Sequence, residues 1–353
     1  MGRDSAEQLR ERVAAAYAAG TPLCITGGNS KSFLGREPCG DILDVAGHRG
    51  IVSYQPSELV ITARAGTPLR DVEMALADHR QMLPFEPPHF GESATLGGTV
   101  ACGLSGPRRP YAGAARDFVL GMTIINGRGE VLRFGGQVMK NVAGFDVSRL
   151  MAGAMGTLGV LLQISLKVLP RPACETTLVQ ERSASEAVFG MNHWAGRPLP
   201  LSATCYDGDR LYVRLAGAES AVEFARRRIG GDVLQEANVF WENIREQRHG
   251  FFAGESLLWR LSVAPATPPL SLPGKWLLEW GGAQRWLKGE ADVALVRRAV
   301  AEMGGHASLF RGAGRDSDRF HPLPQTLLDM HHRLKQAFDP KGILNPGRMY
   351  AWC

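Results

Sequence analysis

The sequence predicts a two-domain α+β protein. At 353 residues the chain exceeds the roughly 250–300 residues that one hydrophobic core usually serves. Its first half is interrupted by loops of glycine and other small residues, whereas six of its seven tryptophans fall between residue 171 and about residue 310. The change in composition near residue 170 separates a loop-rich α+β region from a second α+β region, in which helical patterns alternate with short strands.

Composition and charge exclude several classes of function. The chain holds 44% hydrophobic and 21% charged residues, as is typical of a soluble globular protein. Its net charge of +5 is modest and no basic stripe is interleaved with aromatic residues, so no nucleic-acid partner is predicted. The N-terminus has a charged helical pattern, and no apolar run approaches the ~18 residues of a membrane span. We therefore expect a cytoplasmic protein with no direct membrane span.

The six cysteines are dispersed along the chain and include no CxxC pair. This spacing argues against a zinc or iron–sulfur site within the chain. A chain of this length needs no disulfide staples, so a reducing compartment fits. No metal site is predicted.

The first half is organised around residues 85–107, FEPPHFGESATLGGTVACGLSGP. Small residues dominate this stretch, which allows main-chain N–H groups to approach a ligand closely and form a concave anion site. It contains no run of large apolar residues suited to a core strand or an amphipathic helix. Leu96, Val100 and Leu104 recur as regular aliphatic anchors, which a flexible linker would lack. We interpret this organising stretch as a buried loop pressed against a phosphate-bearing cofactor.

The other elements of the first half follow from periodicity and end signals. Ser5 with Gln8 predicts a capping box for a helix that ends at Gly20. Thr67 and Pro68 predict the N-cap and first turn of a second helix. Short strands are expected at residues 22–25, 42–45, 51–54, 59–63 and 160–169.

Asn126-Gly127 predicts a hairpin between strands at residues 118–125 and 130–134.

In the second half, the tryptophans allow two interpretations, a partner surface or core packing. The elements expected after residue 170 are helices at 185–194, 219–229, 291–303 and 324–338 and strands at 211–215 and 275–279.

Two further loops are rich in small residues. TGGNSKS, residues 26–32, follows the strand at 22–25 and offers bare N–H groups, hydroxyls, an amide and one lysine, a set that suits a pyrophosphate. The loop matches neither the Walker A pattern nor GxGxxG, and a plain hairpin turn is an alternative. The other loop, GFDVSRLMAGAMGTLG at residues 144–159, leads into the strand at 160–169.

Taken together, TGGNSKS, GESATLGGTVACGLSGPRRPY, KNVAGFDVSRLMAGAMGTLGVLLQISLKVLP and the terminal ILNPGRM resemble the vanillyl-alcohol oxidase family, the flavoproteins with a PCMH-type FAD-binding domain. The segments WLLEWGGAQRWL, EPPHFG and GPRRPYAGAARDFVLGM look like one subgroup, the E-type FAD-binding subunits of bacterial glycolate oxidases. The resemblance implies two α+β subdomains around FAD in residues 1–170. It also implies an α+β cap or partner-binding domain with an antiparallel sheet in residues 171–320, and a returning segment in residues 321–353.

The resemblance also implies which residues bind the cofactor. The first loop, residues 26–32, would hold the FAD pyrophosphate. The second loop, which is the organising stretch, would line the pyrophosphate and the flavin. The third loop, residues 144–159, would approach the adenosine or ribityl part. Two residues near the C-terminus would return toward the flavin edge. In this order, the residues are Thr26, Gly27, Gly28, Asn29, Ser30 and Lys31; Ser93, Thr95, Gly97, Gly98 and Thr99; Gly156, Gly159 and Val160; and Asn345 and Arg348.

Some residues depart from the family pattern. Members that tether FAD covalently use His or Cys in or near the first loop, where this chain has Asn29 and Ser30, so non-covalent FAD is predicted. No HxxGDGNxH-like metal and substrate motif is found, and Met155 stands where catalytic relatives commonly have Glu. Lys140 and Asn141 resemble residues that order the third loop. Asp146 is a candidate helix cap.

Oxidation of a 2-hydroxy acid requires a base for the hydroxyl proton, a cation for the carboxylate and flavin N5 to receive hydride. His89, in the organising stretch, is the candidate base, with a structural histidine as the alternative. Arg108 and Arg109 are candidates for bidentate carboxylate or phosphate binding, with a solvated pair as the alternative.

The resemblance leads us to expect the FAD subunit of a complex that oxidises glycolate, or another small 2-hydroxy acid, to glyoxylate. Electrons would pass through the flavin to an iron–sulfur subunit, and a second FAD subunit would belong to the same complex. The protein would be cytoplasmic, held peripherally at the inner membrane by its complex. The alternatives are a self-sufficient FAD-dependent 2-hydroxyacid dehydrogenase and a structural subunit that has lost FAD.

Overall fold

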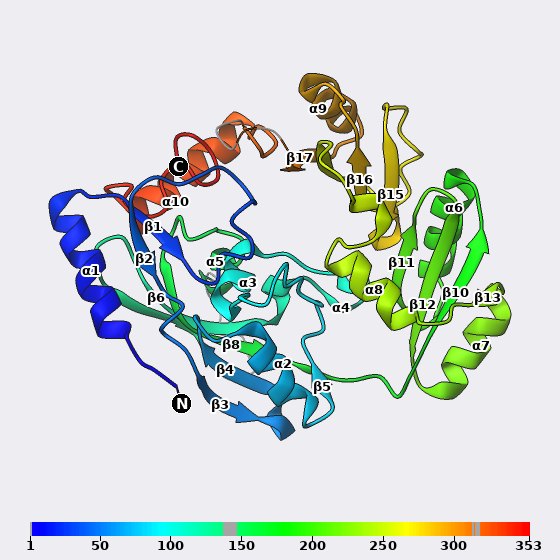
Figure 1. The fold of residues 1–353 in the computed structure, drawn as a ribbon, viewed down its shortest axis with the longest axis horizontal. Helices are drawn as coiled ribbons and strands as arrows, with labels where there is room; N and C mark the ends of the chain where they lie inside the picture. The colour runs from blue at the N-terminus through cyan, green and yellow to red at the C-terminus, as the bar shows by residue number, and fades with distance from the viewer. Residues whose placement is uncertain (1, 137–146, 313, 315–317) are drawn as a thin grey trace. The chain divides into compact units, whose positions relative to one another are not determined.

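The computed structural model describes residues 2–136, 147–312, 314 and 318–353. The chain forms two compact units (Figure 1), the first from the described parts of Met1–Leu104, Ala114–Pro170 and Arg315–Cys353, the second from the described parts of Ser105–Gly113 and Arg171–Gly314. The excursion Ser105–Gly113 thus groups with the second unit. The division of the chain into domains at residues 170 and 320 stays a prediction.

The first unit is built on a five-stranded antiparallel sheet in the order β3-β4-β8-β6-β7, with two small two-stranded sheets, β1-β2 and β5-β9. Its elements are α1 (Ala6–Ala19), β1 (Leu23–Thr26), β2 (Asp41–Asp44), β3 (Ile51–Gln55), β4 (Val60–Arg64), α2 (Leu69–Ala77), β5 (Gln81–Met82), α3 (Leu96–Cys102), β6 (Val119–Ile125), β7 (Val131–Gly135), α5 (Val147–Met151), β8 (Val160–Lys167), β9 (Leu169–Pro170) and α10 (Gln325–Phe338).

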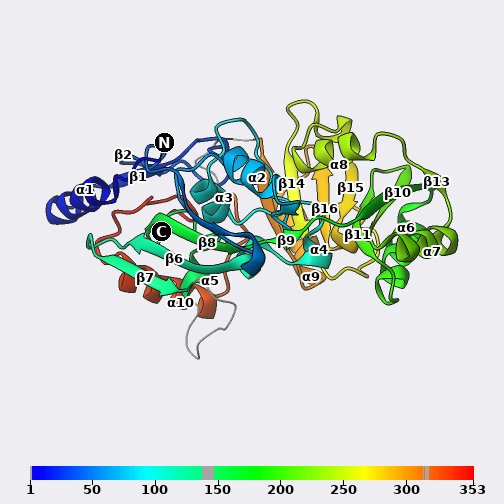
Figure 2. The ribbon, with the colours of Figure 1, turned by 90° about the horizontal axis from the view of Figure 1, so that it is seen from below.

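Burial along the strands follows their place in this sheet. The central strand β8 is buried on both faces at most positions, whereas the edge strand β7 alternates between exposed and half-buried residues. α2 and α3 lie on one side of the sheet and α10 on the other (Figure 2). The expected hairpin is confirmed, since β6 pairs antiparallel with β7 and the Asn126 side chain accepts hydrogen bonds from the N–H groups of Arg128 and Glu130.

Two predicted helix caps are wrong. Ser5 precedes α1 but its side chain makes no capping bond; its backbone N–H donates to His48 Nδ1, and the Asp4 carboxylate accepts from the N–H of Ala6. In α2, Pro68 occupies the N-cap position, one residue later than expected. The hydroxyl of Thr67 donates to the carbonyl of Arg64 at 2.7 Å, and its oxygen accepts from the N–H of Gly50 at 2.9 Å, so its hydrogen bonds are made outside the helix.

The second unit holds an eight-stranded sheet in the order β13-β10-β12-β11-β15-β16-β14-β17, in which the pairings between the described strands are antiparallel. Its elements are α4 (Arg109–Ala112), β10 (Cys174–Glu181), α6 (Ala184–Ala195), β11 (Leu201–Tyr206), β12 (Arg210–Gly217), α7 (Glu219–Ile229), β13 (Asp232–Val233), α8 (Ala237–Arg245), β14 (Leu258–Ser262), β15 (Lys275–Glu279), β16 (Gln284–Lys288), α9 (Val293–Glu302) and β17 (His306–Arg311).

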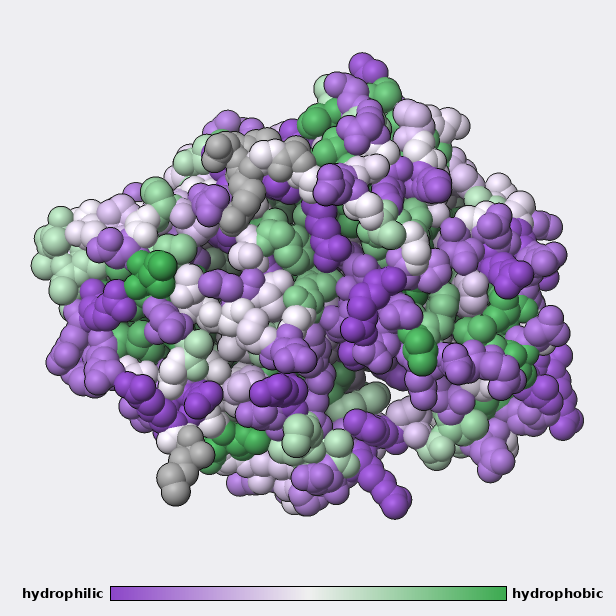
Figure 3. Space-filling view, viewed as in Figure 1, coloured by the Kyte–Doolittle hydropathy of each residue, from purple (hydrophilic) through white to green (hydrophobic). Residues whose placement is uncertain are grey.

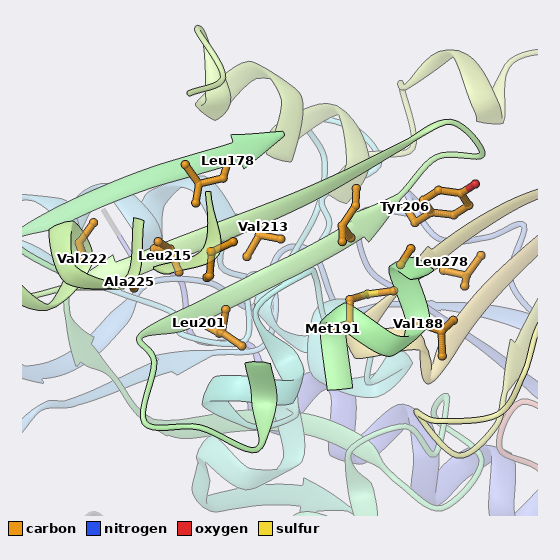
Figure 4. Close-up of a cluster of buried hydrophobic side chains, with 13 residues drawn as sticks. Leu178, Val188, Met191, Leu201, Tyr206, Val213, Leu215, Val222, Ala225 and Leu278 are labelled. Atoms are coloured by element: carbon orange, nitrogen blue, oxygen red, sulfur yellow. The ribbon is translucent and has the colours of Figure 1, made fainter. Parts of the chain in front are cut away.

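Among the described residues, two hydrophobic clusters lie in the core of this unit. In the first, the inner faces of α6 and α7 pack on the strands (Figure 4), and its members include Leu178, Val188, Met191, Val213, Leu215, Val222 and Ala225. In the second, the fully buried Trp259 packs with residues of α9 and β17. The helices and strands expected after residue 170 are confirmed to within two residues at each end.

Most of the tryptophans of this unit belong to its interior. Trp241, Trp280 and Trp286 are buried, as is Trp259, so core packing is the interpretation that holds for these four. The face drawn in Figure 3 is mostly hydrophilic, with small and separated hydrophobic areas. Among the described helices, none combines the length and the hydropathy that a membrane span needs.

Candidate functional site

The C-terminal segment returns to the first unit beside β1 (Figure 1). The N–H of Leu23 donates to the carbonyl of Ile343 at 2.7 Å, and the N–H of Asn345 donates to the carbonyl of Leu23 at 2.9 Å. This pairing places residues from the end of the chain directly next to the first loop.

Asn345 joins β1, the strand that leads directly into the first predicted FAD loop, to the third loop. Its side-chain oxygen accepts from the N–H of Ile25 at 2.6 Å, and its Nδ2 donates to the carbonyl of Met155 at 2.7 Å. The residue has a φ of 44°, a left-handed conformation that asparagine tolerates better than most residues. Asn345 therefore acts on the site by fixing the spacing between the first and third loops.

Arg348 hydrogen-bonds to the backbone at and just beyond the C-terminal end of the first loop. Its guanidinium donates to the carbonyl of Arg36 at 2.9 Å and to the carbonyls of Lys31 and Ser32 at 3.3 Å each. These bonds hold the backbone of the loop in place, so Arg348 supports its shape.

The first loop and the organising stretch touch through glycines. A Cβ on Gly28 would lie 1.4 Å from the carbonyl oxygen of Ser93, and one on Gly27 would lie 2.8 Å from the hydroxyl oxygen of Thr95. The hydroxyl of Ser93 donates back to the carbonyl of Gly28 at 2.5 Å. At Gly28, only a residue without a side chain fits this contact.

The prediction that the organising stretch is a loop without a helix is wrong. α3 begins after Thr95, whose hydroxyl accepts from the N–H of Gly98 at 3.2 Å. Leu96 and Val100, four residues apart, are fully buried on one face of this short helix, and Gly97 lets it approach Ala65 closely. Tertiary packing and a threonine cap stabilise a helix that its glycines disfavour.

The loops line an open cavity of about 330 Å³, which shares lining residues with a smaller cavity of about 80 Å³. Most of the predicted cofactor residues line one or both cavities, while Ser93, Thr99 and Val160 line neither. Those that do are Thr26, Gly27, Gly28, Asn29, Ser30, Lys31, Thr95, Gly97, Gly98, Gly156, Gly159, Asn345 and Arg348.

The polar groups at this cavity fit a phosphate-bearing cofactor. Within the described residues, the backbone N–H groups of Gly27, Gly28 and Asn29 have no carbonyl partner. Lys31 lines the cavity although only 5% of it is exposed, and its ammonium donates to the carbonyl of His89 at 3.1 Å. Backbone donors without internal partners, beside a lysine ammonium, suit a ligand rich in oxygen acceptors.

Sequence reasoning missed several residues of the cavity wall. Cys24, Ala101, Cys102 and Met155 all line the larger cavity. Ala101 and Cys102 lie within the organising stretch on α3, a helix that was not predicted because of the glycines around it. Burial raises the pKa of the Cys102 thiol, which disfavours the thiolate that a covalent attachment would require.

The three candidate catalytic residues have polar or aromatic partners. In the first unit, His89 Nε2 lies 2.9 Å from the Glu73 carboxylate on α2. In the second unit, Arg108 forms an ion pair with Glu175 at 2.7 Å, and the guanidinium of Arg109 lies 4.3 Å from the ring centroid of Trp280. Of the other residues considered from the sequence, Lys140, Asn141 and Asp146 lie outside the described residues.

Removing the Asn345 amide tests its role between the loops. Asn345→Ala is expected to weaken FAD binding about tenfold or more, because it removes the buried hydrogen bond to Met155 and the half-buried one to Ile25, so the spacing of the two loops relaxes. The measurement is titration of the apoprotein with FAD, followed by the quenching of flavin fluorescence. An unchanged dissociation constant would show that the loops hold their spacing without the amide.

Comparisons with known proteins agree with this geometry. Residues 3–135 match the family described as an FAD binding domain, and residues 282–349 match the C-terminal domain of FAD linked oxidases. The chain is 52% identical over 348 residues to the glycolate oxidase subunit GlcE of Escherichia coli (strain K12), covering 99% of this chain and 98% of that protein. It is 30% identical to the glycolate oxidase subunit GlcD of Bacillus subtilis (strain 168), over 85% of this chain and 77% of that one.

A solved structure has the same fold. The 4-ethylphenol oxidase from Gulosibacter chungangensis superposes with a TM-score of 0.72 at 16% identity, covering 100% of this chain and 89% of that chain. The fold and the family matches define a flavoprotein oxidoreductase with a PCMH-type FAD-binding domain, and FAD is its cofactor. Because the relative at 52% identity spans nearly the whole of both chains, the chain belongs to the FAD-linked oxidase family.

Proposed function

We propose that this chain is the FAD-binding subunit of a complex that oxidises glycolate to glyoxylate. The observation that carries the proposal is the 52% identity with a glycolate oxidase subunit over nearly the full length of both chains. The loops around the cavity support it, since their glycines and open N–H groups suit the FAD pyrophosphate. The match to an FAD-binding family argues against the alternative of a structural subunit without FAD.

The chain's own residues would bind and orient the reactants. FAD would supply the acceptor for hydride, held without a covalent bond by the predicted loop residues. His89 would take the hydroxyl proton, and Glu73, 2.9 Å away, would orient its imidazole and stabilise the imidazolium. Arg109 would bind the substrate carboxylate, whereas Arg108 would first have to leave its ion pair with Glu175.

The partners proposed are a second FAD subunit and an iron–sulfur subunit that receives the electrons. The relationship to two differently named glycolate oxidase subunits supports a complex that contains related flavoproteins. We place the complex in the cytoplasm, held peripherally at the inner membrane. A self-sufficient 2-hydroxyacid dehydrogenase is the remaining alternative.

An anaerobic visible spectrum tests the proposal. The purified chain is expected to show a flavin band, and glycolate is expected to bleach it once the partner subunits are added. Bleaching of the chain alone would favour the self-sufficient dehydrogenase. A purified chain that carries no flavin, even after incubation with FAD, would contradict the proposed function.

A further inference from the structure

Trp280 has an unusual place in the second unit. It begins the turn between β15 and β16, with a φ of 56° followed by positive φ at Gly281 and Gly282. A bulky residue in this left-handed region is strained, and such strain persists only where the surrounding structure holds it. The residue is 6% exposed, and its Nε1 donates to the carbonyl of Gly106 at 3.0 Å. The ring is therefore a fixed platform, held at a position that the backbone does not favour.

Two arginines share this platform. The guanidinium carbon of Arg109, on α4, lies 4.3 Å from the ring centroid of Trp280, and that of Arg260, on β14, lies 5.2 Å from the same centroid. Each contact is in the range of a cation–π interaction. Because both guanidinium groups contact the same ring, their charges lie close together. Both arginines are half-buried, so these charges are only partly solvated.

Neighbouring residues orient the Arg260 guanidinium and leave two of its nitrogens available to another acceptor. Its Nε donates to Gln284 at 2.7 Å, and Gln284 in turn donates to the buried carboxylate of Glu279 at 3.0 Å. Burial, followed by the charge of Arg109, lowers the pKa of Arg260 to about 10. In the described part of the chain, this arginine hydrogen bonds through Nε, which leaves Nη1 and Nη2 for another acceptor.

We propose that Arg109 and Arg260, stacked on Trp280, form a binding site for the carboxylate of a small 2-hydroxy acid or its 2-oxo product. A carboxylate accepts paired N–H groups from guanidinium and would relieve the repulsion between the two cations. The sequence does not single out Arg260, because its approach to Arg109 brings together two distant segments. This inference rests on the proposed function, and it identifies where that substrate class would bind.

The test is calorimetric titration of the FAD-loaded chain with oxalate and with glycolate. Arg109→Met and Arg260→Met are each expected to weaken oxalate binding about tenfold or more, since each removes a charged hydrogen-bonding partner. Arg109→Lys, which keeps the charge but loses the planar fork, should fall between Arg109→Met and the unaltered chain. Arg226→Met is the matched control, because Arg226 lies on the exposed face of α7 in the same unit.

Flavin content and circular dichroism are measured for each variant to show that it folds and holds FAD. If Arg260→Met does not fold, the oxalate affinities of the two Arg109 variants test the inference. Unchanged oxalate affinity in these variants, or no binding to the unaltered chain, would overturn the inference. Equal affinity for sulfate would overturn the assignment of the site to a carboxylate. These results leave the proposed function intact as long as the chain retains flavin, whereas loss of flavin from the unaltered chain contradicts the function itself.

Discussion

Gly28→Ala is expected to abolish retention of FAD while the chain stays folded. The added Cβ would lie 1.4 Å from the carbonyl oxygen and 2.4 Å from the carbonyl carbon of Ser93, both backbone atoms that cannot rotate away. The first loop must therefore shift, and its N–H groups with it. A displacement on the order of 1 Å at a functional site can reduce activity about a hundredfold. The measurement is the ratio of flavin to protein absorbance after purification, followed by titration with FAD.

Gly47→Ala is the matched control for this substitution. A Cβ on Gly47 would meet no atom within 4 Å, and its φ is not in the left-handed region. This variant should retain FAD like the unaltered chain. If Gly28→Ala also kept its full flavin content, the first loop would not be held against the organising stretch in the way that the structure places it.

The loops that line the cavity could be singled out from the sequence because they have a local signature. Gly27 and Gly28 follow a short strand, and Gly97 and Gly98 stand among other small residues. Close approach of a backbone to another group favours glycine, so these positions are visible without a structure. The antiparallel sheet of the second unit was expected from the family resemblance.

The features that could not be predicted depend on contacts between residues far apart in the sequence. The amide of Asn345 bonds to Ile25, 320 residues away, and Arg260 meets Arg109 only through Trp280. The sequence did not predict α3 because its glycines have poor helix propensity. Its burial and its Thr95 cap, which stabilise the helix, are properties of the folded chain.

Lys335→Met is expected to destabilise the first unit by about 3–5 kcal/mol, since it leaves a buried charge without its partner. The ammonium of Lys335 lies 2.9 Å from the carboxylate of Asp339 and donates to the carbonyls of Thr157 at 2.8 Å and Leu344 at 2.9 Å. Asp339 is fully buried. Methionine keeps most of the apolar stem but removes all three interactions. Urea unfolding gives the change in free energy.

The same contacts connect Lys335 to the cofactor cavity. Thr157 belongs to the third loop, and Leu344 directly precedes Asn345, the residue that joins that loop to the first. Loss of the ammonium should therefore weaken FAD binding as well as stability. An FAD titration of the folded variant in the absence of urea separates this effect from unfolding.

Lys341→Met is the control for loss of a lysine from the same region. Its ammonium donates to the carbonyl of Tyr17 at an exposed position, so the expected destabilisation is within about 1 kcal/mol. Lys335→Met combined with Asp339→Asn should recover part of the stability, because the amide oxygen still accepts a hydrogen bond from the backbone but carries no buried charge. Equal effects of the two single lysine variants would contradict a buried ion pair that secures the C-terminal segment.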